Sequence, residues 1–171
     1  MALYYFDSSA LVKQYVLEPG SLWVRGLLAA VDKQKDLPAN TVFIADISVA
    51  EATAAFAVLH RIGRLRRSAW DAVFDHFMDD TSWRYRLVGA WRDDFFEAAS
   101  LTRRHPLKAY DAVQLAVALR QNGALATVRQ SLVFVSGDKT LLTAAKAEGL
   151  AIDNPFDHVS PQDTPTASSI S

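Results

Sequence analysis

The 171 residues are enough for one domain with a sizeable core, and 50% hydrophobic with 22% charged residues is an ordinary globular composition. Eighteen basic and nineteen acidic side chains give a formal net charge of −1, which argues neither for nor against a nucleic-acid partner. The absence of cysteine excludes disulfides, thiolate metal sites and a cysteine nucleophile. No apolar run approaches the roughly 20 residues of a membrane span, and the N-terminus lacks the features of a signal peptide, so we expect a soluble, cytoplasmic protein.

The first element is an apolar run at residues 3–6 that stops at Asp7 and is followed by a helix-compatible segment at residues 10–15. This pattern predicts a buried strand that leads into a helix. Asp7 is therefore expected at the carboxyl edge of a sheet, where open α/β folds bind their ligands.

The rest of the chain continues this alternation. Further helices are predicted at residues 22–31, 48–62, around 70–77, and at 95–104, 107–121 and 139–148, the fifth of these ended by Gly123. Further strands are predicted at residues 41–45, 85–91, 132–136 and 151–152, with a loop at 32–40. Alternating strands and helices predict an α/β fold, with a mainly parallel sheet between two helical layers. We expect a domain over residues 1–156 and a loosely held polar tail over 157–171.

Four carboxylates occupy comparable places in these elements. Asp7 and Asp138 each follow a buried strand, whereas Glu51 and Asp111 lie early in helices. If the two strands are central and parallel, all four carboxylates reach the same edge of the sheet.

Each carboxylate also has a purely structural explanation. Asp7 and Asp138 can be helix N-caps, and Ser48-x-x-Glu51 fits a capping box. Asp111 can be a favourable charge at a helix N-terminus.

Together, the four carboxylates favour a cation site. Neighbouring carboxylates raise one another's pKa, and a bound cation removes that cost. Oxygen ligands without cysteine favour Mg²⁺ or Mn²⁺ over Zn²⁺. Such an ion binds a phosphate and activates a water molecule as a nucleophile.

The chain resembles PIN-domain ribonucleases, most of all the VapC-type toxins of toxin–antitoxin pairs, over about residues 2–156. The resemblance rests on four successive motifs: Asp7-Ser8-Ser9-Ala10-Leu11-Val12-Lys13, Ser48-x-x-Glu51, Tyr110-Asp111-Ala112-Val113-Gln114, and Phe134-Val135-Ser136-Gly137-Asp138. It implies a three-layer α/β/α sandwich, metal-dependent endoribonuclease activity, a homodimer and a small antitoxin partner. It makes Asp7, Glu51 and Asp111 the core acidic residues, Asp138 the fourth and more variable one, and Ser8 and Ser136 supporting hydroxyls near the metal.

Basic residues near these motifs are candidate RNA contacts, because a near-neutral protein must bind phosphates through local patches. The candidates are Lys13, Arg104 and Lys108. The alternative is that they are solvated charges, which are favourable in any case where they fall near a helix end.

Two other functions remain open from the sequence. An aspartyl-phosphate phosphatase would use Asp7 as its nucleophile, but Ser9 stands where the usual second acid would be. A catalytically inactive PIN-like fold that binds RNA or protein is the other possibility, against which the complete acidic set argues.

Overall fold

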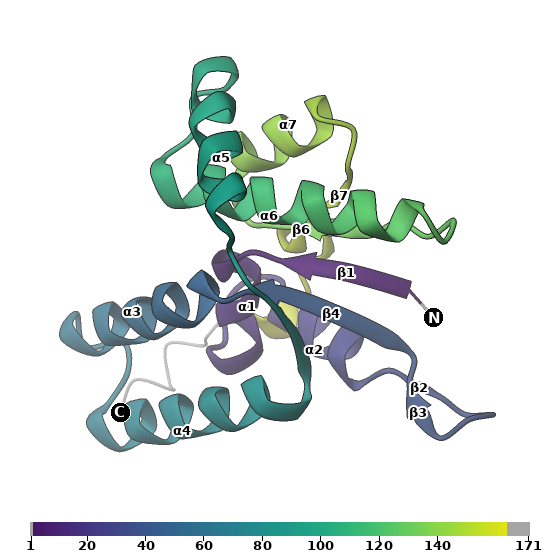
Figure 1. The fold of residues 1–171 in the computed structure, drawn as a ribbon. Coiled ribbons are helices and arrows are strands. Elements are labelled where there is room, and N and C mark those ends of the chain that lie inside the picture. The colour runs from purple at the N-terminus through teal and green to yellow at the C-terminus, as the bar shows by residue number, and fades with distance from the viewer. Residues whose placement is uncertain (1, 164–171) are drawn as a thin grey trace.

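The centre of the computed structural model, which describes residues 2–163, is a five-stranded sheet (Figure 1). All neighbouring strands run parallel. From one edge to the other they are β5 (Tyr85–Val88), β4 (Asn40–Ala45), β1 (Ala2–Phe6), β6 (Val133–Val135) and β7 (Ala151–Asp153). The predicted parallel sheet is therefore confirmed. Its central strand is β1, which explains the continuous apolar run, because such a strand is buried on both faces.

Helices cover both faces of the sheet (Figure 1). One layer contains α1 (Ser8–Tyr15), α2 (Ser21–Ala29), α3 (Ile47–Arg61) and α4 (Arg67–Trp83), and the other contains α5 (Arg92–Arg104), α6 (Ala109–Ala126) and α7 (Lys139–Ala147). Successive side chains of β1 enter different cores: Tyr5 packs with α5–α7 and Phe6 with α1–α4, and neither is exposed. The three-layer α/β/α sandwich is thus confirmed. No helix within residues 2–163 has the length and apolar character needed to cross a membrane.

The register of the sheet brings two strand ends together. Phe6 pairs with Val135, and the next backbone N–H, that of Asp7, donates to the Val135 carbonyl at 3.1 Å. Asp7 and Ser136 therefore leave the sheet side by side at its carboxyl edge.

Two details of the predicted elements are wrong. Residues 32–40, expected as a loop, include an antiparallel hairpin formed by β2 (Val31–Asp32) and β3 (Leu37–Pro38). Its turn places Asp36 at a φ of 52°, which Asp tolerates better than most residues. Gly123 does not end α6, which continues to Ala126 because Leu125 still packs against the core.

The end of the described chain is packed against the start of α2. After β7 come two short 3₁₀ segments, η1 (Pro155–His158) and η2 (Pro161–Asp163). The carboxylate of Asp163 accepts hydrogen bonds from the backbone N–H groups of Gly20 at 3.1 Å and Leu22 at 2.8 Å. The expectation of a loosely held tail is therefore wrong for residues 157–163. The rest of that segment, residues 164–171, lies outside the described residues.

Candidate active site

Asp7 is both a helix cap and a buried carboxylate. Its Oδ1 accepts hydrogen bonds from the Ala10 backbone N–H at 3.0 Å and the Ser9 hydroxyl at 2.7 Å, and Oδ2 accepts one from the Ser136 hydroxyl at 3.0 Å. Only 4% of the residue is exposed. Burial raises the pKa of Asp7 to about 6, against the opposing effect of these hydrogen bonds. A carboxylate that only caps a helix would not need to be buried, where its ionised form is destabilised.

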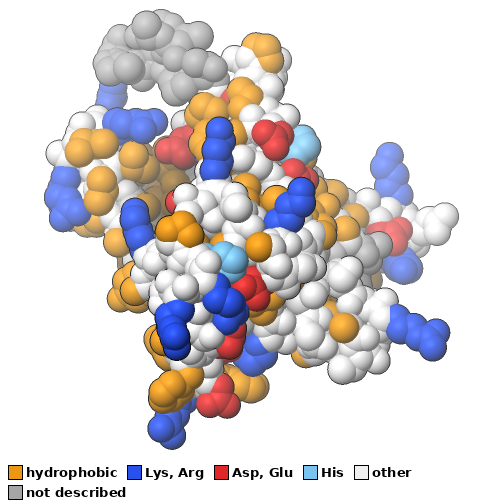
Figure 2. Space-filling view, turned by 90° about the horizontal axis from the view of Figure 1, so that it is seen from above, with side chains coloured by type: hydrophobic (Ala, Val, Ile, Leu, Met, Phe, Trp, Pro, Cys, Tyr) orange, Lys and Arg blue, Asp and Glu red, His pale blue; other side chains and the backbone are white. Residues whose placement is uncertain are grey.

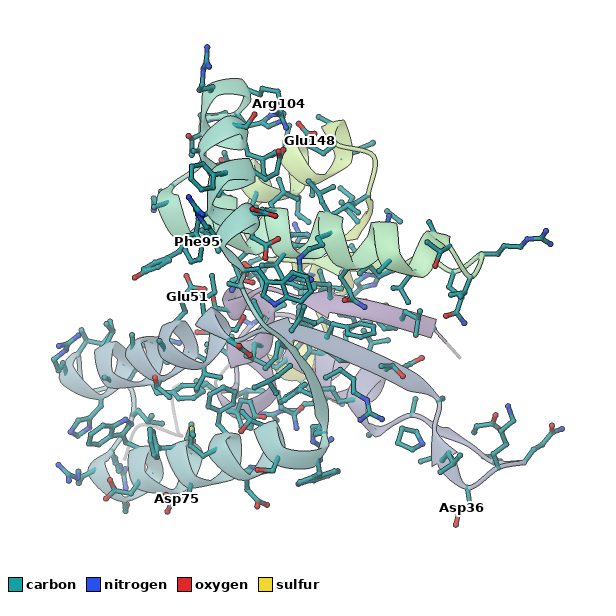
Figure 3. All side chains as sticks on the ribbon, in the orientation of Figure 1. Asp36, Glu51, Asp75, Phe95, Arg104 and Glu148 are labelled. Carbon is teal, nitrogen blue, oxygen red and sulfur yellow. The ribbon has the colours of Figure 1, made fainter. Side chains whose placement is uncertain are left out.

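Glu51 does not form the capping box that Ser48-x-x-Glu51 suggests. Because α3 begins at Ile47, Ser48 is already inside the helix, and the cap residue Asp46 makes no side-chain hydrogen bond. Instead, Glu51 Oε2 accepts hydrogen bonds from Ser8 Oγ at 3.0 Å and from Gln114 Nε2 at 2.7 Å. Figure 3 shows Glu51 extending from α3 toward the opposite helical layer. Its contacts bring together α1, α3 and α6.

Asp138 is linked to Asp7 through one hydroxyl group. Ser136 Oγ, which donates to Asp7, accepts a hydrogen bond from the Asp138 backbone N–H at 2.9 Å. The Asp138 carboxylate caps α7 by accepting hydrogen bonds from the N–H groups of Thr140 and Leu141 at 2.7 and 3.0 Å. The predicted cap is thus confirmed, and the Asp138 backbone is linked to Asp7 through the Ser136 hydroxyl.

Asp111, in the first turn of α6, is partly buried. Burial raises its pKa, and the negative charges of Asp138 and Glu51 raise it further, against a smaller opposing effect of Lys108. Asp111 therefore lies within electrostatic reach of both Asp138 and Glu51.

A pocket of about 980 Å³ opens beside these groups. Its polar lining includes Ser8, Ser9, Glu51 and Asp138, and the rest is mostly apolar, from α3 and from Phe156 of η1. The carboxylates of Asp7 and Asp111 are not part of the lining, although Asp7 is hydrogen-bonded to Ser9, which is. The pocket lining therefore combines three carboxylates and Lys13 with mostly apolar side chains.

The carboxylates suit a hard cation chemically, although no ready-made cage exists. Within residues 2–163, no three Asp, Glu or His side chains lie close enough together to hold a metal ion directly. Burial raises the pKa of both Asp7 and Asp111, and a bound cation would favour their ionised forms. Mg²⁺ characteristically binds through one or two carboxylates and keeps several waters, so this donor set fits it.

Two of the three candidate RNA contacts are engaged within the protein. Lys13 is only 2% exposed; its Nζ lies 3.4 Å from Glu18 Oε2 and 4.1 Å from the centre of the Phe156 ring. Arg104 reaches from α5 to Glu148 beyond the end of α7, with Nε 3.0 Å from Glu148 Oε1 (Figure 3). Lys13 is thus buried, whereas Arg104 is exposed but already paired with carboxylates.

Lys108, in contrast, is exposed at the start of α6, three residues before Asp111. Figure 2, which views the molecule from above the α5–α7 layer, shows Lys and Arg side chains scattered between apolar and acidic ones. That face presents no single continuous basic surface, so phosphate binding there would depend on individual residues such as Lys108.

Sequence reasoning missed two supporting residues. The Ser9 hydroxyl donates to Asp7 Oδ1 and accepts from the Gly137 backbone N–H at 2.7 Å, so it joins the two strand ends. Gln114 is buried in α6 and donates to Glu51. Its signal in the sequence was a polar residue on an Ala-rich helix, three positions after Asp111 and so on the same face.

No protein-family model and no curated protein sequence matches the chain significantly, but solved structures do. PAE2754 from Pyrobaculum aerophilum is 22% identical, with a TM-score of 0.59 over 92% of this chain and 85% of that one. FitAcB from Neisseria gonorrhoeae is 18% identical, with a TM-score of 0.59 over 91% and 99% of the two chains. A toxin–antitoxin complex from Klebsiella pneumoniae is 15% identical, with a TM-score of 0.56 over 90% and 98%. At such identities the likeness concerns the fold, and it extends over about nine-tenths of the chain. The protein therefore shares the fold of these structures, a parallel sheet between two helical layers, which is the fold that the resemblance of its motifs implies.

Proposed function

We propose that this protein is a divalent-metal-dependent endoribonuclease and the toxin of a toxin–antitoxin pair. The observation that carries the proposal is the buried Asp7 carboxylate, with a pKa of about 6, at the carboxyl edge of a PIN-type sheet. Glu51 supports it, because the hydrogen bonds of this residue serve no helix cap.

Asp7, Glu51, Asp111 and Asp138 would hold Mg²⁺ or Mn²⁺, directly or through water. When bound, such an ion neutralises phosphate charge and lowers the pKa of a coordinated water, which is the chemistry that hydrolysis of a phosphodiester needs. The protein's own groups orient the carboxylates beforehand. Ser136 and Ser9 hold the two oxygens of Asp7, and Ser8 holds Glu51. Hydrogen bonds of this kind, from neighbouring side chains to metal ligands, typically set the orientation of the ligands and the affinity of the site for the metal.

The proposal is tested by cleavage of a structured RNA in Mg²⁺, in Mn²⁺ and in EDTA, with wild-type protein and Asp111→Asn. Cleavage should require the metal, and the variant should lose about 10²–10³ in rate, as is common when one electrostatic contributor is removed from an active site. Melting temperatures confirm that the variant is folded. Cleavage that persists in EDTA, or a folded variant with full activity, would refute the proposal.

The alternative is a catalytically inactive fold that binds RNA or protein. The observation in its favour is that residues 2–163 contain no preformed ligand cluster. It predicts RNA or protein binding without cleavage under any metal condition, so the same assay decides between the two.

We further propose a small antitoxin protein as partner. The similar structure from Klebsiella pneumoniae is described as a toxin–antitoxin complex. In this chain, the apolar part of the pocket, where Val58 is 44% exposed on α3, offers a surface for an apolar segment of such a protein. Co-expression with a small neighbouring reading frame should give a stable complex with wild-type protein, and Val58→Asp should weaken it. Equal complex formation by the variant would exclude this surface.

A homodimer is proposed from a second apolar surface, at the start of α5. Trp91, Phe95 and Phe96 are 62%, 49% and 64% exposed there, and a group of exposed aromatic side chains is a common feature of protein–protein interfaces. Phe95 lies on the same side of the molecule as Glu51 (Figure 3). Light scattering at high micromolar concentration should give twice the monomer mass, and Phe96→Asp should lower it. A wild-type monomer would contradict this proposal.

A further inference from the structure

Gln114 is a buried amide whose hydrogen-bonding groups join three elements of the fold. It is 1% exposed on α6. Its Oε1 accepts a hydrogen bond from the Tyr5 hydroxyl of β1 at 2.8 Å. Its Nε2 donates to Ser48 Oγ at 2.8 Å and to Glu51 Oε2 at 2.7 Å, both on α3. A polar group this deep in the protein is tolerated because both ends of the amide have partners.

The orientation of this amide is determined by the partners around it. Tyr5 is fully buried and stacked on Phe134, with ring centres 5.5 Å apart and planes 13° apart, so its hydroxyl group is held in place. A hydroxyl donor on one side and a carboxylate on the other allow only one arrangement. Rotating the amide by 180° would place its oxygen against Glu51 and leave the carboxylate without this donor.

The consequence for Glu51 is an asymmetric carboxylate. Both of its hydrogen bonds, from Gln114 and from Ser8, go to Oε2. Within residues 2–163, Oε1 accepts no hydrogen bond and is available to a ligand. Glu51 is also one of the residues that line the pocket.

We propose that Gln114 is a positioning residue, which holds Glu51 in the conformation that binds a divalent cation. This inference rests on the proposed function, because it needs Glu51 to take part in cation binding. The hydrogen bonds from Tyr5 to Gln114 and from Gln114 to Glu51 connect the central strand to this side chain on α3, and so restrict its movement. The helix that carries Asp111 thus also supports the carboxylate of Glu51, one turn further along.

The test compares the affinity for Mn²⁺ with thermal stability. Gln114→Met keeps the approximate volume of the side chain but removes the hydrogen bond to Glu51. Losing such a support typically weakens metal affinity about 10–100-fold, and we expect this loss when Mn²⁺ binding is measured by titration. Ser48→Ala is the matched control: it removes a buried hydrogen bond of the same amide but leaves the one to Glu51 intact. We expect it to lower the melting temperature in EDTA without changing Mn²⁺ affinity.

A double-mutant cycle shows whether Gln114 acts through Glu51. In the Glu51→Gln background, Gln114→Met should cause no further loss of Mn²⁺ affinity, because the group that it positions has already lost its charge. If Gln114→Met does not melt cooperatively, Gln114→Asn serves in its place, since its amide is one methylene too short to reach Glu51.

The possible outcomes are distinct. If wild-type protein binds Mn²⁺ and Gln114→Met binds it equally well, or if its effect persists fully in the Glu51→Gln background, the role of Gln114 is refuted while the proposed function stands. If wild-type protein does not bind Mn²⁺, the proposed function itself fails, and this inference fails with it.

Discussion

Replacing Asp7 by Asn should stabilise the metal-free protein at neutral pH. Burial raises the pKa of Asp7 from an ordinary 3.8 to about 6, so the native state holds this carboxylate ionised only at a cost. Each pKa unit corresponds to ~1.4 kcal/mol, and the difference therefore amounts to about 3 kcal/mol at pH 7.5. Asn keeps the size of the side chain and an acceptor for Ser9 and Ala10. At about 2–4 °C per kcal/mol for a chain of this length, the melting temperature should rise by roughly 6–12 °C.

The stabilisation expected for Asp7→Asn depends on pH. Because the folded-state pKa lies above that of the unfolded chain, native Asp7 keeps its proton between about pH 4 and 6 while the unfolded chain loses it. The contribution of this proton to wild-type stability is therefore present at low pH and is lost as the pH rises through about 6. The gap in melting temperature between Asp7→Asn and wild type should be small near pH 4 and largest above about pH 7.

The measurement is differential scanning calorimetry in EDTA at several pH values, with Asp163→Asn as the control of opposite sign. Burial raises the pKa of Asp163, but hydrogen bonds from the backbone N–H groups of Ser160, Leu22 and Gly20, together with nearby Lys13, outweigh it and lower the pKa below its ordinary value. That variant should be destabilised at neutral pH, and less so as the pH falls. An Asp7→Asn protein that melts no higher than wild type at pH 7.5, or a gap that is the same at pH 4.5, would refute the reasoning.

Three other predictions concern catalysis, backbone strain and RNA contacts. In cleavage assays, Asp7→Asn and Asp111→Asn combined should lose far less than the product of their separate losses, because both act through one cation; independent effects would argue against a shared site. Gly20→Ala should destabilise the protein by about 1–3 kcal/mol or more in urea titrations, since Gly20 has a φ of 87° and an added Cβ would lie 2.3 Å from a carbonyl oxygen of η1. Unchanged stability would show that η1 moves away freely. Lys108→Ala should raise the KM for RNA and reduce its salt dependence, whereas Arg104→Ala, whose side chain is already bound to acidic partners, should change KM little; the reverse order would reassign the RNA contact.

The sequence alone determined the order of the strands and helices, and it placed Asp7 and Asp138 at the starts of two helices. The apolar runs before Asp7 and Asp138 are local signals: a buried central strand needs apolar residues on both faces, and an Asp shortly after it caps the following helix. The structure confirms both caps, and the alternation of strands and helices was enough to predict the parallel sheet. The β2–β3 hairpin had no such signal, since its two short strands lack an alternating pattern.

Only the tertiary structure decided what the side chains do. Ser48-x-x-Glu51 reads locally as a capping box, yet Glu51 binds Gln114, 63 positions further along the chain. Lys13 and Arg104 read as free cations, yet both meet carboxylates in the folded chain. Burial of Asp7, and with it the pKa of about 6, depends on how α1 and β6 close around it. The physical reason is common to these cases: backbone conformation follows largely from neighbouring residues, whereas hydrogen-bond partners and desolvation depend on segments that meet only after folding.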